Sequence, residues 1–489
     1  MAEYDYDIGV IGGGAGGLTV TSGAAQLGAK TLLVEKEKEL GGDCLHFGCV
    51  PSKTLIKTAH VYHWMKNSAK FGLPVIDVPP VDFREIAKRI KSVIGTIQHH
   101  DSEERFCKLG AQVEFGQPAF TDAHSIDLNG HTYTAKNWVI ATGSSPVAPP
   151  IRGLDKVDYI TNKEIFYLDH LPKSMIVLGG GPIGTEMSQA FCRLGTKVSV
   201  VDMAPHILVN EDADMANAVQ EVLSQEGVKF YLNSKIEEVN NLGSEKEVKI
   251  KTREGGSISL KAETVLVALG RGANTNDLGL ENIGVEYTPR GIKVDRRLRT
   301  NLKHVYAAGD VNGGFQFTHA AGYEGGIVIS NAIFRLPRKV DYTFLPWCTY
   351  TDPPLGSIGM NEKSAAAAGI KYNVWTEEFK DNDRSLAEAE TVGRIKMLLD
   401  EKEKPIGVQI LGPHAGDLLG EWVAILNAKV KLSTLAAAIH PYPTIAEINK
   451  KVAGSYFSPK IFSEKVQKGL KFFFHLKGRA CAEDSCVEQ

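Results

Sequence analysis

The start of the chain alternates between short apolar runs and a stretch with helical spacing. Residues 7–10 begin an apolar run, residues 18–27 suit a helix, and residues 30–34 are a second apolar run. This order predicts a strand, a helix and a second strand, the βαβ unit from which parallel sheets are built. The same order returns at residues 175–201, so the chain is predicted to contain two such units.

A glycine-rich turn joins the first predicted strand to its helix. Gly12, Gly14 and Gly17 have the spacing G-x-G-x-x-G, and Glu35 closes the second strand. The first glycine permits a tight turn, the second lets a pyrophosphate approach the backbone, and the third lets the helix pack closely on the strand. The carboxylate of Glu35 can accept hydrogen bonds from a ribose hydroxyl. Together these residues predict a dinucleotide site.

The second unit repeats this arrangement with Gly179, Gly181, Gly184 and Asp202. Its strands and helix are predicted at residues 175–178, 187–194 and 197–201. In both units the acid follows the first glycine by 23 residues. One such glycine motif is weak evidence because glycine-rich turns are common. Two complete copies with equal spacing favour two nucleotide sites over glycines that only allow packing.

Composition and charge narrow the classes of protein. A chain of 489 residues is too long for a single core, so about two to four domains are expected. The apolar fraction of 43% fits a globular protein, and a formal net charge of -3 argues against a nucleic-acid partner. The N-terminal residues have none of the features of a secretory signal, so a cytoplasmic address is expected. In that reducing compartment, seven cysteines favour catalytic or metal-binding use over structural disulfides.

Two cysteines, Cys44 and Cys49, stand five residues apart in the segment from Gly41 to Lys53. A helical segment with a distorted turn would let the two sulfur atoms meet, so an intrachain disulfide is feasible. Half of a zinc site is the rival interpretation, but no second cysteine or histidine pair at ligand spacing stands nearby in the sequence. The pair is therefore the predicted redox centre.

The segment from Gly41 to Lys53 resembles the active-site motif of the class I pyridine nucleotide-disulfide oxidoreductases. That family includes dihydrolipoamide dehydrogenase, glutathione reductase and mercuric reductase. The resemblance continues, in the family's order, along nearly the whole chain. Its further segments are residues 138–143, 300–310, 317–320 and 323–325. Each segment alone is a common strand end or turn, and their order is what carries the resemblance.

The resemblance implies an α/β fold with two Rossmann-like three-layer domains, one for FAD and one for NAD, and a C-terminal α+β dimerisation domain. A homodimer is expected. The implied boundaries are residues 1–150 and 276–339 for the FAD domain, 151–275 for the NAD domain, 340–460 for the dimerisation domain and 461–489 for a basic tail.

The resemblance also implies the path of the electrons. NADH would reduce the flavin, and electrons would pass on to a Cys44–Cys49 disulfide, with Cys44 meeting the substrate and Cys49 lying against the flavin. Lys53 and Glu186 match a charged pair near the flavin N5, where a fixed positive charge steadies the reduced ring. The implied FAD-binding residues are Gly12, Gly14, Gly17, Glu35, Lys53, Gly143, Asp310, Phe317, Thr318, His319 and Ala320, and the NAD-binding residues are Gly179, Gly181, Gly184, Asp202 and Gly270.

The choice of nicotinamide is predicted from Asp202. A carboxylate at this position favours the free ribose 2′-hydroxyl of NAD and repels the 2′-phosphate of NADP. None of the four residues after Asp202 is an arginine. A preference for NADH is therefore expected.

The C-terminal part departs from the family pattern at one residue. Disulfide-reducing members supply a catalytic histidine across the subunit interface in a His-Pro-Thr motif, followed by a glutamate that Glu447 matches. Aligning the Pro-Thr of that motif puts Tyr442 in the histidine's place, with His440 two residues away. A tyrosine is a poor base at neutral pH because its reference pKa is near ~10.

Mercuric reductase is similar in carrying a tyrosine at that place, and it needs no thiol base. The leading hypothesis is therefore a mercuric reductase-like enzyme that reduces a thiol-reactive acceptor. One alternative is a dihydrolipoamide dehydrogenase or another disulfide reductase, with His440 or Tyr442 as the acid. Another is a flavoprotein sensor or electron-transfer module that acts on a partner protein.

The tail from residue 460 to residue 479 contains six basic residues and one acid, interleaved with apolar residues. Such a stretch suits an anionic surface such as a membrane, although it is more often a helix packed on its own domain. Cys481 and Cys486 follow, and mercuric reductase and some thioredoxin reductases resemble this chain in carrying a C-terminal cysteine pair. The two thiols are either a shuttle to the redox centre or idle groups on a frayed end.

Overall fold

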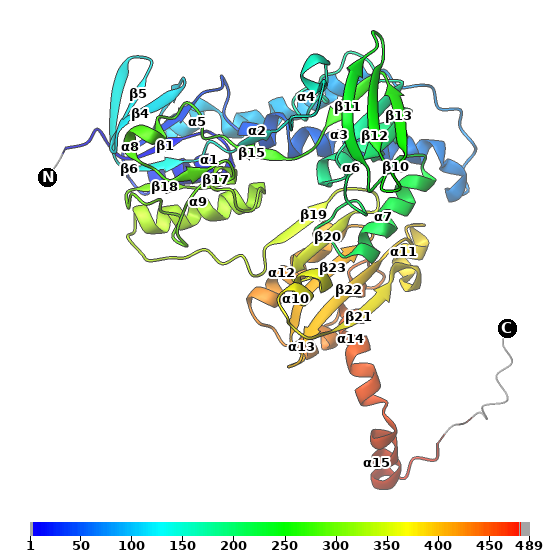
Figure 1. The fold of residues 1–489 in the computed structure, drawn as a ribbon. Helices are drawn as coiled ribbons and strands as arrows, with labels where there is room; N and C mark the ends of the chain where they lie inside the picture. The colour runs from blue at the N-terminus through cyan, green and yellow to red at the C-terminus, as the bar shows by residue number, and fades with distance from the viewer. Residues whose placement is uncertain (1–2, 479, 481–489) are drawn as a thin grey trace. The chain divides into compact units, whose positions relative to one another are not determined.

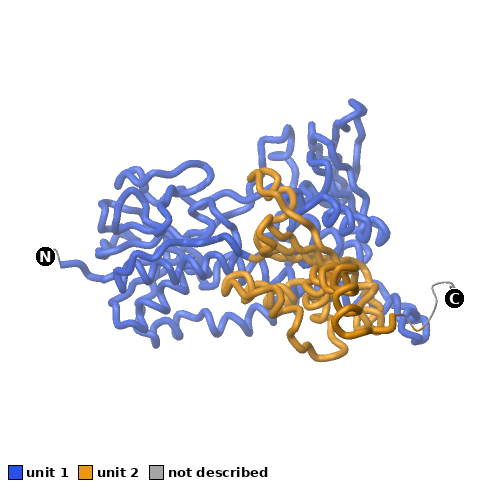
Figure 2. Tube along the Cα trace, turned by 90° about the horizontal axis from the view of Figure 1, so that it is seen from below, with its two compact units in different colours: residues 1–345, 349–351 blue, residues 346–348, 352–489 orange. Residues whose placement is uncertain are grey.

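The computed structural model describes residues 3–478 and 480, and Figure 1 labels its helices and strands. Its contacts divide it into two compact units, which Figure 2 colours separately. Unit 1 comprises residues 1–345 and 349–351, and unit 2 comprises residues 346–348 and 352–489. In the part of the chain that the structure describes, no helix has both the length and the apolar character needed to span a bilayer.

The first sheet of unit 1 contains the first predicted βαβ unit. Its strands are β1 (Tyr6–Ile11), β2 (Thr31–Glu35), β3 (Ala111–Phe115), β4 (Pro118–Asp122), β5 (Ser125–Leu128), β6 (His131–Ile140) and β18 (Val305–Ala307). They run in the order β3-β2-β1-β6-β5-β4, and β18 pairs with β6. The pairs among β1, β2, β3, β6 and β18 are parallel, whereas β4, β5 and β6 form an antiparallel edge.

Both faces of this sheet are covered, which explains why its central strands are apolar without interruption. On one face, Val10 and Leu33 pack with Val20 of α1 (Ala15–Gln26) and Val328 of α9 (Thr318–Ala332). On the other face, the residues next to them in sequence, Ile11 and Val34, join a second core cluster. α1 begins three residues earlier than the apolar pattern predicts because the glycine turn itself forms its first turn.

A second parallel sheet in unit 1 contains the second βαβ unit. Its order is β10-β9-β8-β14, and one face packs on the antiparallel sheet β11-β12-β13. α6 (Pro182–Leu194) connects β8 to β9 and packs on α3 (Cys49–Lys66). The strands are β8 (Ser174–Leu178), β9 (Lys197–Val201), β10 (Lys229–Tyr231), β14 (Thr264–Val267), β11 (Lys235–Asn241), β12 (Lys246–Lys251) and β13 (Ser257–Ala262).

Unit 2 is built on a five-stranded sheet in the order β19-β20-β23-β22-β21. Its strands are β19 (Pro346–Thr349), β20 (Leu355–Gly359), β21 (Tyr372–Glu378), β22 (Arg394–Asp400) and β23 (Pro405–Leu411). The pairs from β20 to β21 are antiparallel, and α12 (Ala415–Asn427) and α14 (Glu447–Ile461) pack on the sheet. The predicted α/β fold with a separate C-terminal α+β part is confirmed. The predicted domain boundaries remain predictions.

The basic tail forms a helix that does not pack on its own unit. This helix, α15 (Glu464–Phe474), has no buried residue, although packing was the more usual expectation for such a segment. The reason is its place in the chain: it follows the last sheet-covering helix, α14, and the structure gives its apolar side chains no core to enter.

The third glycine of each turn is where the fold tolerates no side chain. A Cβ at position 184 would lie 2.0 Å from the carbonyl oxygen of Gly179, whereas a Cβ at position 181 would meet nothing within 4 Å. We expect Gly184→Ala to lower the free energy of unfolding by about 3 kcal/mol, because backbone must move, and Gly181→Ala by under about 1 kcal/mol. Thermal unfolding followed by circular dichroism measures both. Equal melting temperatures for the two variants would contradict the close-approach argument.

Candidate functional site

The first glycine turn has the geometry that the nucleotide prediction requires. Gly12 has φ +108°, Gly14 is the residue that caps α1, and a Cβ on Gly17 would lie 1.8 Å from the carbonyl oxygen of Gly12. A Cβ on Gly14 would meet only the Cα of Gly42 at 3.8 Å, so a phosphate can approach this part of the helix N-terminus. These residues fit the pyrophosphate of FAD.

The acid at the end of β2 is fixed by the backbone. One carboxylate oxygen of Glu35 accepts from the Gly13 amide at 2.6 Å, and the other accepts from the Glu37 amide at 2.8 Å. Each oxygen keeps a further lone pair that can accept from a ribose hydroxyl. The side chain is thus held ready beside the glycine turn rather than directed to solvent.

The second glycine turn repeats the first in detail. Gly179 has φ +109°, and the Asp202 carboxylate accepts from the Gly180 amide at 2.6 Å and from the Ala204 amide at 2.8 Å. The same two hydrogen bonds, at the same two lengths, hold Glu35 in the first turn. Equal spacing in the sequence therefore corresponds to equal geometry, and the second turn fits the phosphates and adenosine ribose of a nicotinamide dinucleotide.

The two predicted redox cysteines lie at the junction of two helices. Cys44 is in α2 (Gly42–His46), and Cys49 is the first residue of α3, with Gly48 between the helices. A Cβ on Gly48 would come 2.9 Å from the carbonyl oxygen of Asp43. The absence of a side chain at Gly48 therefore lets the start of α3 fold back on α2. Both cysteines are free thiols here, and they hydrogen-bond to each other.

The pKa values of the two thiols are shifted in opposite directions. The hydrogen bond from Cys44 lowers the pKa of the Cys49 thiol to about 6; burial opposes this, while Thr318 and the charge of Lys53 assist it. That same hydrogen bond and burial raise the pKa of the Cys44 thiol. The Cys49 sulfur lies 3.5 Å from the Thr318 hydroxyl, so the N-termini of α3 and α9 both point positive ends at it.

The predicted pair of Lys53 and Glu186 is formed. The Lys53 ammonium lies 2.9 Å from the Glu186 carboxylate, whose side chain is only 6% exposed. The other carboxylate oxygen accepts from the Tyr350 amide at 2.8 Å, and the ammonium lies 4.6 Å from the centre of the Tyr350 ring. Burial alone would lower the pKa of Lys53, but the attraction of Glu186 outweighs burial and the pKa is raised. Lys53 is therefore a fixed positive charge one helical turn from Cys49.

A polar network connects the predicted FAD ligand Asp310 to the redox loop. Ser144 donates to the Asp310 carboxylate, Arg271 donates to the Ser144 hydroxyl at 2.8 Å, and the Arg271 guanidinium lies 3.0 Å from the carboxylate of Asp43. Burial raises the pKa of the Asp310 carboxyl, and the bond from Ser144 opposes that effect. Asp43 immediately precedes Cys44, so the network ends beside the thiol that is predicted to meet the substrate.

Four residues of this site were not predicted from the sequence: Asp43, Ser144, Arg271 and Tyr350. Three of them stand beside predicted ones, because Asp43 precedes Cys44, Ser144 follows Gly143 and Arg271 follows Gly270. For these three residues, the position next to a predicted site residue was the one indication in the sequence of a role in the site. Tyr350 had none, since it acts through its backbone amide and its ring face.

The remaining predicted nucleotide residues lie at chain turns. Gly143 has φ +70° and Gly270 has φ +125°, and each precedes one strand of a short antiparallel pair, β7 (Ser144–Pro146) and β15 (Arg271–Ala273). The segment from Phe317 to Ala320 forms the start of α9, where the rings of Phe317 and His319 stack with centroids 5.3 Å apart. These positions bring backbone amides and flat rings to the edge where Asp310 lies.

The predicted C-terminal residues lie in unit 2, which is described by itself. The His440 side chain is 10% exposed, and its Nε2 lies 3.1 Å from the Glu421 carboxylate. Tyr442 is 71% exposed, and its hydroxyl donates to Asp383 at 2.8 Å. Glu447 accepts from the Thr444 amide at 3.3 Å. Glu421, which the sequence analysis missed, is therefore the carboxylate that holds His440. Cys481 and Cys486 lie outside the described residues.

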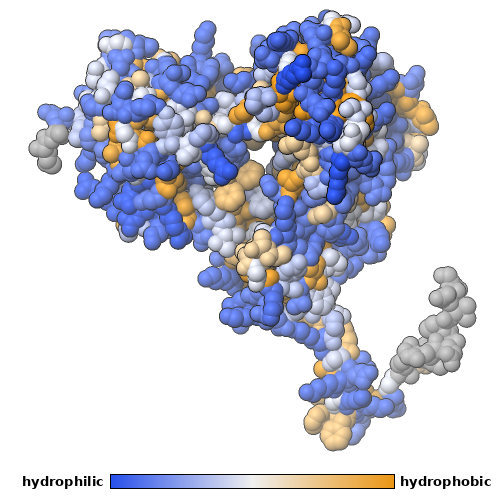
Figure 3. Space-filling view, viewed as in Figure 1, coloured by the Kyte–Doolittle hydropathy of each residue, from blue (hydrophilic) through white to orange (hydrophobic). Residues whose placement is uncertain are grey.

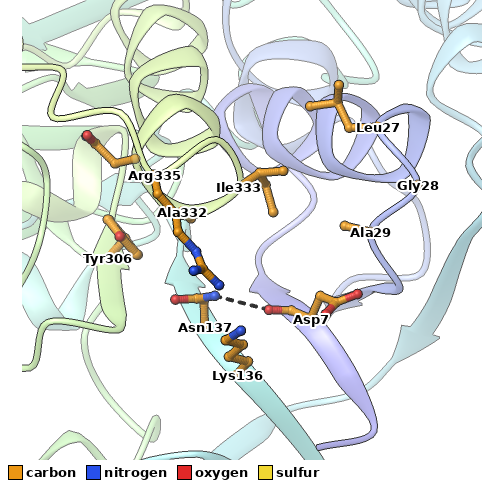
Figure 4. A pocket seen from close by; sticks show the side chains of 11 residues that line it. Asp7, Leu27, Gly28, Ala29, Lys136, Asn137, Tyr306, Ala332, Ile333 and Arg335 are labelled. Carbon is orange, nitrogen blue, oxygen red and sulfur yellow. Dashed lines mark hydrogen bonds between the residues drawn. The ribbon is translucent and has the colours of Figure 1, made fainter.

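One described cavity lies away from these residues. Its volume is about 430 Å³, and Figure 4 shows that it opens beside Asp7, near the amino end of β1. The first glycine turn follows the carboxyl end of that strand. The cavity is lined by Asp7, Leu27, Gly28, Ala29, Lys136, Asn137, Tyr306, Asn331, Ala332, Ile333 and Arg335. It contains no residue of the redox centre.

Comparison with known proteins identifies the class. The family described as pyridine nucleotide-disulphide oxidoreductase matches residues 6–325, and its dimerisation domain matches residues 345–453. The chain is 34% identical to dihydrolipoamide dehydrogenase of Chaetomium thermophilum, covering 94% of this chain and 92% of that protein. It is 32% identical to mercuric reductase of Streptomyces lividans, covering 94% of this chain and 98% of that protein.

A solved structure is also similar. The HOCl-induced flavoprotein disulfide reductase RclA from Escherichia coli superposes with a TM-score of 0.82 at 26% identity, covering 92% of this chain and 99% of that one. The chain belongs to the class I pyridine nucleotide-disulphide oxidoreductase family. It is an FAD-dependent oxidoreductase and carries a dimerisation domain, as the resemblance implied.

The acidity of Cys49 can be tested through the flavin contact that the family resemblance implies for it. We expect the long-wavelength charge-transfer absorbance of the reduced holoenzyme to be present above pH about 6 and to fade as the pH falls through that value. Thr318→Val removes a hydroxyl that lowers the pKa of Cys49, so its midpoint should move to higher pH. Thr58→Val, on the same helix as Cys49 but further along it, is the control and should leave the midpoint unchanged. A midpoint that stays in place in Thr318→Val would refute the role of that hydroxyl.

Proposed function

We propose that this enzyme uses NADH to reduce a thiol-reactive acceptor at Cys44 and Cys49, with mercuric ion as the leading candidate. The observation that carries the proposal is the contrast between the largely buried, Glu421-paired His440 and the exposed Tyr442. The proposed working form is a homodimer in which Tyr442 of one protomer faces the redox centre of the other. A cytoplasmic address is proposed because free thiols persist in a reducing compartment.

Exchange with a dithiol substrate needs a base that can accept a thiol proton near neutral pH. Tyr442 does not meet that requirement, because its hydrogen bond to Asp383 raises the pKa of its phenol above the ordinary value. The side chain stays protonated and acts as a hydrogen-bond donor. His440 has the right chemistry for a base, but its Nε2 is held by Glu421 and its Nδ1 is buried, so neither nitrogen is presented to a substrate in unit 2.

Reduction of a thiophilic metal ion does not need a base that accepts a thiol proton. Thiolates bind soft metal ions, and the pKa of about 6 for Cys49 provides one at neutral pH. When bound, FAD takes two electrons from NADH and passes them to the cysteine pair. Overall, Hg(II) gains two electrons and becomes Hg(0), while NADH becomes NAD⁺ and releases one proton. Tyr442 gives up its hydrogen bond to Asp383 and donates to the incoming complex instead, and Lys53 keeps its charge throughout.

Two findings support a metal acceptor. Several of the similar curated proteins are mercuric reductases, among them that of Streptomyces lividans. A Cu(II) complex of RclA from Escherichia coli is among the solved structures that resemble this chain, with a TM-score of 0.82. The second candidate function is disulfide reduction, and the dihydrolipoamide dehydrogenases favour it at 33–35% identity, against 31–32% for the mercuric reductases.

The acceptor is tested by NADH oxidation with Hg(II) and excess thiol, beside lipoamide, glutathione, coenzyme A and thioredoxin disulfides. We expect Hg(II) to stimulate turnover and the disulfides to give roughly 100-fold less, since a base contributes about 10²–10⁴-fold. Tyr442→Phe should slow the Hg(II) reaction by about tenfold, the value of one hydrogen bond. His440→Gln is the matched control and should change the rate by less than about twofold.

Turnover with lipoamide that exceeds turnover with Hg(II), and that His440→Gln abolishes, would establish the second candidate instead. Silence with every small acceptor would favour an electron-transfer role toward a partner protein. The same assay with Cys481→Ala and Cys486→Ala decides whether those thiols act as a shuttle, because a shuttle predicts a slower Hg(II) reaction at low thiol concentration.

The nicotinamide preference follows from Asp202. Its two backbone hydrogen bonds hold the carboxylate in place, so the 2′-phosphate of NADPH would meet a like charge that cannot move away. We expect kcat/KM to favour NADH by roughly 100-fold. Asp202→Ala should reduce that preference to under about tenfold, and Asp155→Ala, an exposed acid elsewhere in unit 1, should leave it unchanged. Higher kcat/KM with NADPH in the unaltered enzyme would overturn the assignment.

A further inference from the structure

The helix α15 stands apart from every other helix of its length, because none of its residues is buried. It spans Glu464–Phe474, and the Ser463 hydroxyl caps it by accepting from the Val466 amide. α15 follows α14, the last helix that packs on the sheet of unit 2. The match to the family's dimerisation domain ends at residue 453, before α15 begins. The family's common fold therefore does not account for it.

One face of α15 is apolar. Val466, Leu470 and Phe473 recur at intervals of four and three residues, so they share one side of the helix, and Phe462 lies just before its cap. Their exposed fractions lie between 39% and 74%. Phe472, Phe474 and Leu476 add exposed apolar surface at the end of the helix. Figure 3 shows apolar and hydrophilic atoms side by side there. A contiguous apolar face of this kind marks an interaction surface.

The rest of α15 is basic. Lys465, Lys468 and Lys471 occupy the remaining sides, Lys477 follows, and Glu464 is the one acid between residues 462 and 478. Glu464 pairs with Lys468 at 3.2 Å. The chain as a whole has a net charge of -3, so this surplus of positive charge is local. The partner of α15 should therefore present both apolar groups and negative charge.

We propose that α15 binds the surface of an anionic phospholipid membrane. An 11-residue helix is about 16 Å long, too short to cross a bilayer and long enough to lie in the headgroup region with its aromatic face in the acyl chains. The lysines then contact lipid phosphates, and the two contributions together give reversible binding. A second copy of the chain is the less suitable occupant, because pairing two apolar faces leaves both sets of lysines without an opposite charge, which anionic lipid supplies.

The test uses the full-length holoenzyme and sedimentation with vesicles. We expect binding to vesicles of phosphatidylcholine with about 30% phosphatidylglycerol, and at least about tenfold weaker binding to phosphatidylcholine alone. Each lysine near an anionic surface is worth roughly fivefold in affinity. Replacing Lys465, Lys468 and Lys471 by Gln should therefore weaken binding by well over tenfold. Leu470→Ser with Phe473→Ser should have a similar effect through the loss of apolar burial.

The matched control is Phe334→Ser with Leu336→Ser, two exposed apolar residues of unit 1. It should bind vesicles as the unaltered protein does, and reduction of the flavin by NADH should be unchanged in all variants. Binding that does not depend on anionic lipid, or that survives both α15 variants, would overturn the proposal. So would an absence of vesicle binding combined with a dimer that Leu470→Ser and Phe473→Ser dissociate, because α15 would then join two copies of the chain.

Discussion

The ion pair of Lys53 and Glu186 is the interaction on which the redox site depends. Lys53 lies one turn after Cys49 on α3, and Glu186 lies on α6, the helix that begins at the second glycine turn. The pair therefore ties the cysteine helix to the nicotinamide half of unit 1. Glu186 is buried, so removing Lys53 would leave a buried charge without its partner, which costs about 3–5 kcal/mol in proteins. The Tyr350 amide satisfies the second carboxylate oxygen.

This ion pair affects both the packing of α3 and the pKa of the Cys49 thiol. The charge that holds α3 on α6 also lowers the pKa of the Cys49 thiol, together with Cys44 and Thr318. A lysine in that place without a fixed carboxylate would be mobile, and its effect on the sulfur would be screened by water. Glu186 therefore acts on Cys49 in two ways: it fixes the Lys53 charge that lowers the pKa of the thiol, and its own negative charge raises that pKa. The low pKa of the Cys49 thiol therefore depends on the packing of α3 against α6 as well as on residues close to it in the sequence.

The parts of the fold that could be predicted from the sequence are those fixed by neighbours in the chain. The glycine turns and the acids after them were predicted, because steric limits at Gly12 and Gly17 act over a few residues. The contacts that were missed join distant residues, as Arg271 does with Asp43 and Tyr350 does with Lys53. No periodicity records such a contact. The isolation of α15 was missed for the converse reason, since an amphipathic pattern does not say whether a partner surface exists within the chain.

The proposed acceptor also rests on a contact between residues that are not neighbours in the sequence, the contact of His440 with Glu421. His440 and Tyr442 are separated only by Pro441, yet the first is held by Glu421 of helix α12 while the second is exposed. A sequence alignment detects that a tyrosine stands in the histidine's place, but not that the nearby histidine is engaged elsewhere. Glu421 also accepts from Asn449, whose carbonyl accepts from the buried Trp422, so the engagement is built into the core of unit 2. Freeing His440 for catalysis would require that core to reorganise. The fold is shared with disulfide reductases, so a difference in the acceptor would have to come from side chains such as those that unit 2 exposes.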